Sequence, residues 1–157
     1  MALREPVRVY IGLGANLGDP AATVRSAIAG LAALPHTTLL ATSGLYRSTP
    51  VDSGGPDYVN AVAALDTRLT APALLAGLQA QEQQAGRERP YRNAPRTLDL
   101  DLLLFGSARI ASPALTVPHP RMAGRAFVLL PLAEIAPGLV PPEWLRAVEG
   151  QGVWRLL

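Results

Sequence analysis

Leu98-Asp99-Leu100-Asp101-Leu102 is the most informative stretch of this 157-residue chain, because apolar and acidic residues alternate along it. Such alternation predicts a half-buried β-strand, and it places Asp99 and Asp101 on one face, about 7 Å apart at Cα. Aspartate is disfavoured in strands, and two like charges on one face repel each other. The pattern therefore predicts a cation between the two carboxylates, and Mg²⁺ prefers such oxygen ligands. The alternative is a solvated strand face without a metal.

The residues that follow this alternation predict burial. Residues 102–105, Leu-Leu-Leu-Phe, form a continuous apolar run that ends at Gly106. Such a run is typical of a central strand that is covered on both faces. Because paired carboxylates on an otherwise buried strand are characteristic of functional sites, we expect this strand to open into a cleft beside Asp99 and Asp101.

The composition predicts one globular domain spanning residues 1–157. Hydrophobic residues make up 49% of the chain and charged residues 17%, which separates it from disordered proteins. The apolar runs are shorter than the roughly 20 residues that a membrane span needs, and the first residues lack the apolar core of a signal peptide. We therefore expect a cytoplasmic protein without a membrane partner. The net charge of +2 is too small to argue for nucleic-acid binding.

Two residue types are missing, and their absence limits the chemistry. The chain has no cysteine, which excludes disulfides and thiolate nucleophiles, and all 14 basic residues are arginine. Without lysine, a P-loop, a protein-kinase site and a Schiff base are excluded. With only 2 histidines, a multi-histidine zinc site is not expected. Phosphate binding would have to use arginine, backbone amides and metal.

The order of the expected elements predicts an α+β fold. Asp19 and Thr70 can each cap a helix, with proline in the first turn, and Gly86 can end the second helix. The elements expected in chain order are a strand at 7–13, a helix at 20–34, strands at 37–47 and 58–67, a helix at 71–86 and the aspartate strand at 98–105. This β-α-β-β-α-β order is that of ferredoxin-like antiparallel sheets with helices on one face. Residues 123–136 and 141–149 are expected to form additional C-terminal helices.

An arginine-rich segment lies immediately before the aspartates. Gly86-Arg87-Glu88-Arg89-Pro90-Tyr91-Arg92-Asn93-Ala94-Pro95-Arg96 holds four of the 14 arginines. Arginine binds phosphate oxygens through two parallel hydrogen bonds, so arginines beside a metal-binding carboxylate pair suit a triphosphate. The segment is rich in glycine, proline and polar residues, which predicts a mobile loop. The alternative is an ordinary solvated loop.

Three further motifs are candidates for ligand contacts. Gly12-Leu13-Gly14-Ala15-Asn16-Leu17-Gly18 has the wrong spacing for a Rossmann fingerprint, yet its glycines allow close approach of a ligand. Tyr58 and Asn60 share one strand face, where the ring can stack on a flat heterocycle and the amide can bond its edge. His119 lies between two prolines and is followed by Arg121 and Arg125; a lone histidine is more often structural. From its own pattern, Phe127 is most simply a core residue.

Together these motifs resemble the hydroxymethyl-dihydropterin pyrophosphokinases of folate biosynthesis. The resemblance covers residues 9 to about 137 and follows the family's motif order. It rests on the segments 11–18, 46–47, 56–60, 95–101 and 117–120, with Arg125 and Phe127. The family has a ferredoxin-like α+β fold, and its enzymes transfer pyrophosphate from ATP to the hydroxymethyl group of a dihydropterin and release AMP.

The resemblance implies a role for each matching residue. Asp99 and Asp101 would be catalytic and would hold two Mg²⁺ ions, with Arg87 and Arg96 as further catalytic groups. The residues implied in pterin binding are Tyr58, Asn60, Phe127, Ser48, Pro50 and Val51. The residues implied in ATP binding are Gln79, Glu82, Arg87, Arg96, Leu102, Thr116, His119 and Arg125. The partners would be ATP and the pterin alcohol, and we expect a monomer, with a weak dimer as the alternative.

Two other classes of protein remain open. A binding module on a ferredoxin-like sheet would recognise RNA or a small ligand, but RNA-binding versions carry several aromatics, and here aromatics are only 5%. An NAD(P) enzyme is disfavoured by the glycine spacing.

Overall fold

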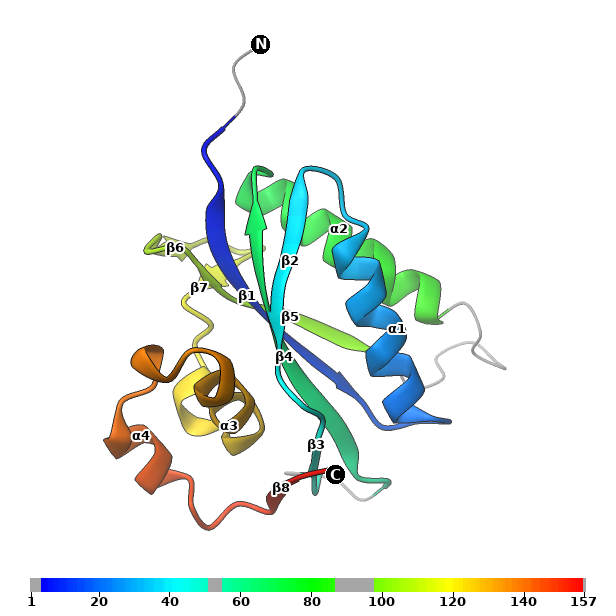
Figure 1. Cartoon of the computed structure of the whole chain (residues 1–157), viewed down its shortest axis with the longest axis vertical. Coiled ribbons are helices and arrows are strands. Elements are labelled where there is room, and N and C mark those ends of the chain that lie inside the picture. Colours follow the sequence, from blue (N-terminus) through cyan, green and yellow to red (C-terminus); the bar gives the residue numbers. More distant parts are fainter. Residues whose placement is uncertain (1–3, 51–54, 87–97, 157) are drawn as a thin grey trace.

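A six-stranded antiparallel sheet forms the centre of the protein, with helices on both of its faces (Figure 1). The computed structural model describes residues 4–50, 55–86 and 98–156. The strands are β1 (Val7–Ala15), β2 (Thr37–Thr42), β3 (Tyr46–Ser48), β4 (Tyr58–Thr67), β5 (Asp99–Phe105), β6 (Ile110–Ala111), β7 (Thr116–Val117) and β8 (Val153–Arg155). The α-helices are α1 (Pro20–Ala32), α2 (Ala71–Gly86), α3 (Ala126–Ile135) and α4 (Pro142–Ala147), and two 3₁₀ turns are η1 (Met122–Gly124) and η2 (Pro137–Leu139).

The sheet confirms the predicted α+β class and the antiparallel arrangement. The strand order is β5-β1-β4-β3-β8, and β2 pairs with the other end of β4; β6 and β7 form a separate hairpin. Among the helices of the described residues, none combines the length and apolar character needed to cross a membrane.

The predicted helix starts are confirmed by their caps. The Asp19 carboxylate accepts a hydrogen bond from the backbone N–H of Ala22 at 3.1 Å, and α1 begins at Pro20. The Thr70 hydroxyl accepts one from the N–H of Ala73 at 3.2 Å, just before α2. These side chains satisfy N–H groups that a helix leaves without a partner in its first turn.

Three sequence predictions need correction. The expected strand at 37–47 is two strands, because its pairing with β4 shifts after Leu39 and Ser43 then exchanges hydrogen bonds with Val62. The expected helix at 123–136 is interrupted: Arg125 has an extended backbone between η1 and α3 (φ −123°, ψ 109°). Strand β8 was not expected.

The third correction concerns β5, which lies at the edge of the sheet rather than at its centre. Its two faces are nevertheless covered, since Leu102 and Leu103 point to opposite faces and are both buried. Two groups bond the outer edge: the N–H of His119 donates to the carbonyl of Leu103 at 2.9 Å, and Glu82 accepts from the N–H of Leu100 at 2.9 Å. The apolar run therefore indicates that other elements cover both faces of the strand. It does not indicate that β5 has a neighbouring strand on each side.

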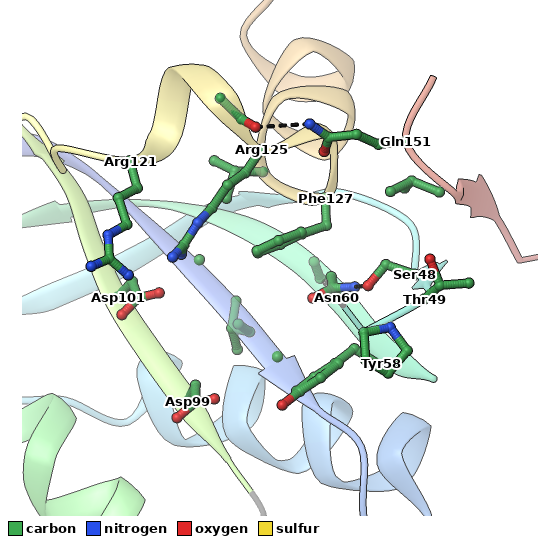
Figure 2. A pocket seen from close by; sticks show the side chains of 18 of the residues that line it. Ser48, Thr49, Tyr58, Asn60, Asp99, Asp101, Arg121, Arg125, Phe127 and Gln151 are labelled. Atoms are coloured by element: carbon green, nitrogen blue, oxygen red, sulfur yellow. Dashed lines mark hydrogen bonds between the residues drawn. The ribbon is translucent and has the colours of Figure 1, made fainter. Parts of the chain in front are cut away.

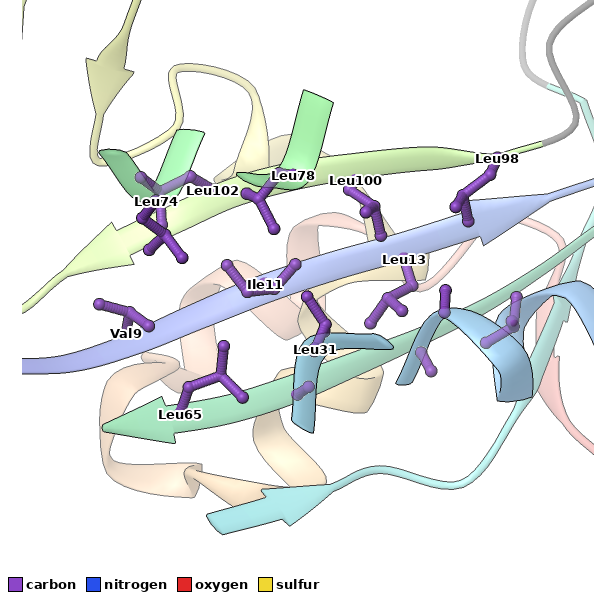
Figure 3. Close-up of a cluster of buried hydrophobic side chains, with 14 of the residues drawn as sticks. Val9, Ile11, Leu13, Leu31, Leu65, Leu74, Leu78, Leu98, Leu100 and Leu102 are labelled. Atoms are coloured by element: carbon purple, nitrogen blue, oxygen red, sulfur yellow. The ribbon is translucent and has the colours of Figure 1, made fainter. Parts of the chain in front are cut away.

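The two faces of the sheet carry two separate apolar cores. The larger core lies between the sheet and helices α1 and α2, where alternate residues of β1 and β4 such as Ile11 and Leu65 are fully buried (Figure 3). The smaller core joins the other face to α3 and α4 and includes Val62, Leu103 and Leu129. The predicted helix layer of a ferredoxin-like fold is the first of these, and the C-terminal helices cover the opposite face.

A polar network fixes α3 to the sheet. The Tyr46 hydroxyl donates to one oxygen of Glu134 at 2.7 Å, and the backbone N–H of Gly44 donates to the other at 3.0 Å. Arg155 of β8 lies 3.5 Å from the same carboxylate. One side chain of α3 therefore binds the start of β3 and the C-terminal strand together.

Candidate active site

A cavity of about 950 Å³ opens on the sheet face that carries α3 (Figure 2). Residues from β1, β3, β4, β5, the η1–α3 segment and the C-terminal segment line it. They are Gly12, Leu13, Gly14, Ser48, Thr49, Pro50, Tyr58, Asn60, Ala61, Asp99, Asp101, Pro120, Arg121, Gly124, Arg125, Phe127, Val128, Gln151, Gly152 and Val153.

Strand alternation places the functional side chains of the sheet on this one face. Because residues i and i+2 of a strand point the same way, Asp99 and Asp101 of β5 face the cavity while Leu100 is buried in the core behind them. The prediction that the two carboxylates share a face is therefore confirmed. Tyr58 and Asn60 share the same face of β4.

The floor between these side chains is made by glycine. In the sheet register Gly14 pairs with Asp99 on one side and Asn60 on the other, and Gly12 pairs with Asp101. Paired residues point to the same face, so the two missing side chains leave the space between the aspartates and Asn60 open. The predicted close approach of a ligand to the glycine segment would take place over this floor, and it stays a prediction.

The two carboxylates can take only part of a metal ion's coordination sphere. Asp99 is exposed and Asp101 is half-buried. Within the described ranges no group of three or more His, Asp or Glu side chains is gathered. A pair of carboxylates is nonetheless the donor set that fits Mg²⁺ when phosphate oxygens and water complete the shell.

Positive charge faces the aspartates across the cavity. Figure 2 shows Arg121 and Arg125 reaching from the η1–α3 segment toward Asp101. The guanidinium carbon of Arg125 lies 5.4 Å from the centre of the Phe127 ring, a cation–π distance. Cations opposite a carboxylate pair suit a ligand that brings both metal ions and phosphate.

The opposite end of the cavity suits a flat polar heterocycle. Tyr58 and Phe127 both present rings to it (Figure 2). Asn60 is only 3% exposed, and its amide nitrogen donates to the Ser48 hydroxyl at 2.7 Å, which fixes the orientation of the amide. Phe127, expected from its own pattern to be a core residue, packs on the smaller core and also lines the cavity.

His119 lies beside the aspartate end. Burial lowers the pKa of His119 below its usual range; the Asp101 carboxylate opposes this shift, and Arg125 and Arg121 add to it. Its Nδ1 accepts a hydrogen bond from the backbone N–H of Arg121 at 3.2 Å. A neutral imidazole whose Nδ1 accepts carries its hydrogen on Nε2, where it can donate to an oxygen of a ligand.

Among the described residues, the predicted Gln79, Glu82, Leu102 and Thr116 are not part of the cavity lining. Glu82 bonds the backbone of β5 beside the aspartates, and Gln79 is exposed on the same helix. Thr116 is exposed on β7, while the Leu102 side chain is buried in the larger core, so that only its main chain could meet a nucleotide. Arg87, Arg96 and Val51, and the loop predicted to be mobile, lie outside the described residues.

Several residues that line the cavity were not predicted to do so, among them Arg121, Thr49 and Gln151. Arg121 could have been found, because it follows the His-Pro pair and precedes Arg125 at helical distance. Gln151, Gly152 and Val153 carry no signal in the sequence, since they are brought to the site only by the pairing of β8 with β3. Thr49 lies between Ser48 and Pro50, two residues implied in pterin binding.

Known proteins share this sequence and this fold. Residues 10–137 match the family model of 7,8-dihydro-6-hydroxymethylpterin-pyrophosphokinase. A 2-amino-4-hydroxy-6-hydroxymethyldihydropteridine pyrophosphokinase of Pseudomonas aeruginosa is 48% identical over 95% of this chain and 96% of its own, and one of Haemophilus influenzae is 44% identical over 87% and 86%.

A solved structure, a Plasmodium falciparum HPPK-DHPS variant, superposes with a TM-score of 0.68 at 12% identity; the match covers 97% of this chain and 43% of that one. That likeness supports the fold alone, because the identity is low and this chain spans under half of the longer protein. The sequence matches carry the assignment: this chain belongs to the 7,8-dihydro-6-hydroxymethylpterin-pyrophosphokinase family.

Proposed function

We propose that this protein transfers a pyrophosphoryl group from ATP to the hydroxymethyl group of 6-hydroxymethyl-7,8-dihydropterin and releases AMP, a step of folate biosynthesis. One observation carries the proposal: a carboxylate pair, two arginines and an aromatic pair line a single cavity in a chain of this family. The first two groups suit a metal-bound triphosphate, and the third suits the pterin ring.

The reaction needs alignment and charge neutralisation rather than a covalent nucleophile. The alcohol oxygen attacks the β-phosphorus, and the bond from that phosphorus to the oxygen shared with the α-phosphorus breaks in line with the attack. AMP leaves with the electron pair of the broken bond, and the alcohol proton passes to solvent. This explains how a chain without lysine or cysteine can carry out the transfer.

The pterin end of the cavity holds the acceptor. Tyr58 and Phe127 would enclose the ring, and the Asn60 amide, oriented by Ser48, would bond its edge. Pro50 would line the same wall, and Val51, assigned on the resemblance, would extend it. The glycine floor lets the ring lie close to the sheet, so that its hydroxymethyl group points toward the aspartates.

Asp99 and Asp101 would hold two Mg²⁺ ions. When bound there, Mg²⁺ supplies charge neutralisation for the triphosphate and for the attacking oxygen. Arg125 and His119 would contact phosphate oxygens, and Gln79, Glu82, Leu102 and Thr116 would border the nucleotide. Arg87 and Arg96 are assigned to catalysis and nucleotide binding on the resemblance.

Product analysis tests this proposal directly. The protein is incubated with ATP, Mg²⁺ and the pterin alcohol, and the nucleotide product is identified by chromatography; a sample without the pterin measures plain hydrolysis. AMP that forms only with the pterin is the expected result. ADP would indicate an ordinary kinase, and no turnover would indicate a binding module; either result contradicts the proposal.

A further inference from the structure

The C-terminal segment reaches the cavity through one side-chain amide. The Nε2 of Gln151 donates to the carbonyl of Gly124 at 2.9 Å, and its Oε1 accepts from the N–H of Ala126 at 2.9 Å (Figure 2 draws the first bond). The Gly124 carbonyl and the Ala126 N–H belong to the residues immediately before and after Arg125. The carboxamide therefore pairs with the main chain at Arg125 as a neighbouring strand would.

The Gln151 carboxamide bonds the chain where α3 has no side-chain cap of its own, although the Arg125 main chain also bonds locally, to Met122, Val128 and Leu129. Arg125 precedes α3 with an extended backbone, and its side chain makes no capping hydrogen bond. The first N–H of α3, that of Ala126, is satisfied instead by Gln151, which is 25 residues further along the chain. The direction of the Arg125 main chain decides where its guanidinium and the Phe127 ring enter the cavity, and both line it.

The same segment is attached to the opposite wall of the cavity. The N–H of Thr49 donates to the carbonyl of Gly152 at 3.0 Å, and β8 pairs with β3. A Cβ built on Gly152 would lie 2.9 Å from the Thr49 hydroxyl, so the contact between the two segments is close. Residues 151–152 thus connect the wall formed by β3 to the wall formed by α3.

We propose that Gln151 is a positioning residue for pterin binding: it holds Arg125 and Phe127 at the correct distance from the wall formed by β3, whose Ser48 pairs with Tyr58 of β4. The inference rests on the proposed function. It is specific to a part of the chain beyond residues 10–137, the range that the family model matches. Gln151 acts through its neighbours, so its effect should appear in pterin binding more than in the chemical step.

The test uses substitutions that keep size and change hydrogen bonding. Gln151→Met retains the length of the side chain and removes both bonds, whereas Gln151→Glu retains the acceptor for Ala126 and loses the donor to Gly124. Both variants should have a higher pterin Kd, measured by calorimetry in the presence of a non-hydrolysable ATP analogue. The increase should be at least fivefold in Gln151→Met. The KM for the pterin should rise more than kcat falls, and the thermal midpoint shows that each variant is folded. Glu149→Gln, exposed on the same segment, is the matched control and should be unchanged.

A double-mutant cycle separates positioning from a merely structural role. If Gln151 acts through Phe127, then Gln151→Met should add little to the loss caused by Phe127→Ala, because the ring it positions is already absent. An unchanged pterin Kd in Gln151→Met, or fully additive losses in the double variant, would overturn the inference. If the wild-type protein bound pterin but formed no AMP, the proposed function would be wrong. The effect of Gln151 on the pterin Kd could still be measured in that case.

Discussion

The amide nitrogen of Asn60 and the hydroxyl of Ser48 lie 2.7 Å apart, and this bond directs the amide oxygen of Asn60 over Gly14. The oxygen is 3.2 Å from the position that a Cβ on Gly14 would occupy. One hydrogen bond between two strands therefore decides which polar atom of Asn60 faces the glycine floor.

Removing the acceptor should weaken pterin binding. In Ser48→Ala the buried amide of Asn60 loses its partner and can rotate, so we expect the pterin Kd to rise about fivefold, equivalent to about 1 kcal/mol. Calorimetric titration measures this. Ser112→Ala is the control, since that hydroxyl likewise makes a hydrogen bond, to the main chain of Leu115, but lies away from the cavity. Equal affinities in wild type and Ser48→Ala would contradict the role given to the bond.

The glycine floor can be tested separately. Gly14→Ala places a methyl group 3.2 Å from the Asn60 oxygen and fills the space beside Asp99, so we expect about a tenfold loss of pterin affinity, about 1.4 kcal/mol. Gly138→Ala is the control, because a Cβ there meets no atom within 4 Å. If both variants bind pterin as wild type does, the floor is not the ligand surface.

The two aspartates should be essential for turnover. Asp99→Ala and Asp101→Ala each remove a ligand of the proposed ions, and we expect kcat/KM to fall by at least about 10²-fold in each. Removing divalent cations with a chelator should abolish activity, and added Mg²⁺ should restore it. Asp66→Ala, which removes a strand aspartate paired with Arg8 at 2.7 Å, should stay near wild type. Near-normal rates in either cavity variant would falsify the metal assignment.

Stability at high pH should depend on Tyr46. Burial, and then its hydrogen bond to Glu134, raises the pKa of Tyr46 from 10.0 to about 12. A group whose pKa is raised by folding contributes stability below its unfolded pKa and loses it as the pH rises through the folded value. The free energy of unfolding should therefore fall between pH 10 and about 12. Denaturant titrations should show a shallower fall in Tyr46→Phe; identical slopes would contradict this linkage.

Local patterns of residues predict the parts of the fold that depend on local interactions. The caps Asp19 and Thr70 and the alternation at Asp99 and Asp101 each act over a few residues, and all were predicted correctly. The division of residues 37–47 into two strands depends on bonds to Val62 and Glu134, which are distant in sequence. The sequence of residues 37–47 contains no pattern that indicates these distant partners.

The candidate site shows the same limit. Side chains with distinctive chemistry, such as Tyr58 and Asn60, can be recognised as candidates from the sequence alone. Gln151 cannot, because an amide near the C-terminus becomes informative only when its partners Gly124 and Ala126 are known. The edge position of β5 was not predicted for a related reason. Apolar residues on both faces of a strand indicate that layers pack above and below it, but they do not indicate which strands pair with its edges.

The division of the sheet into two apolar cores has a consequence for how this protein can change. The layer shared with α1 and α2 lies behind the sheet, opposite the cavity, and contains large fully buried side chains such as Leu31, Leu74 and Leu78. Repacking side chains of that layer such as Leu31, with Leu102 and the α2 residues Gln79 and Glu82 kept, should adjust heat tolerance without touching the groups proposed to bind the pterin. Thermal adaptation and substrate preference can therefore evolve, or be engineered, on opposite sides of one sheet.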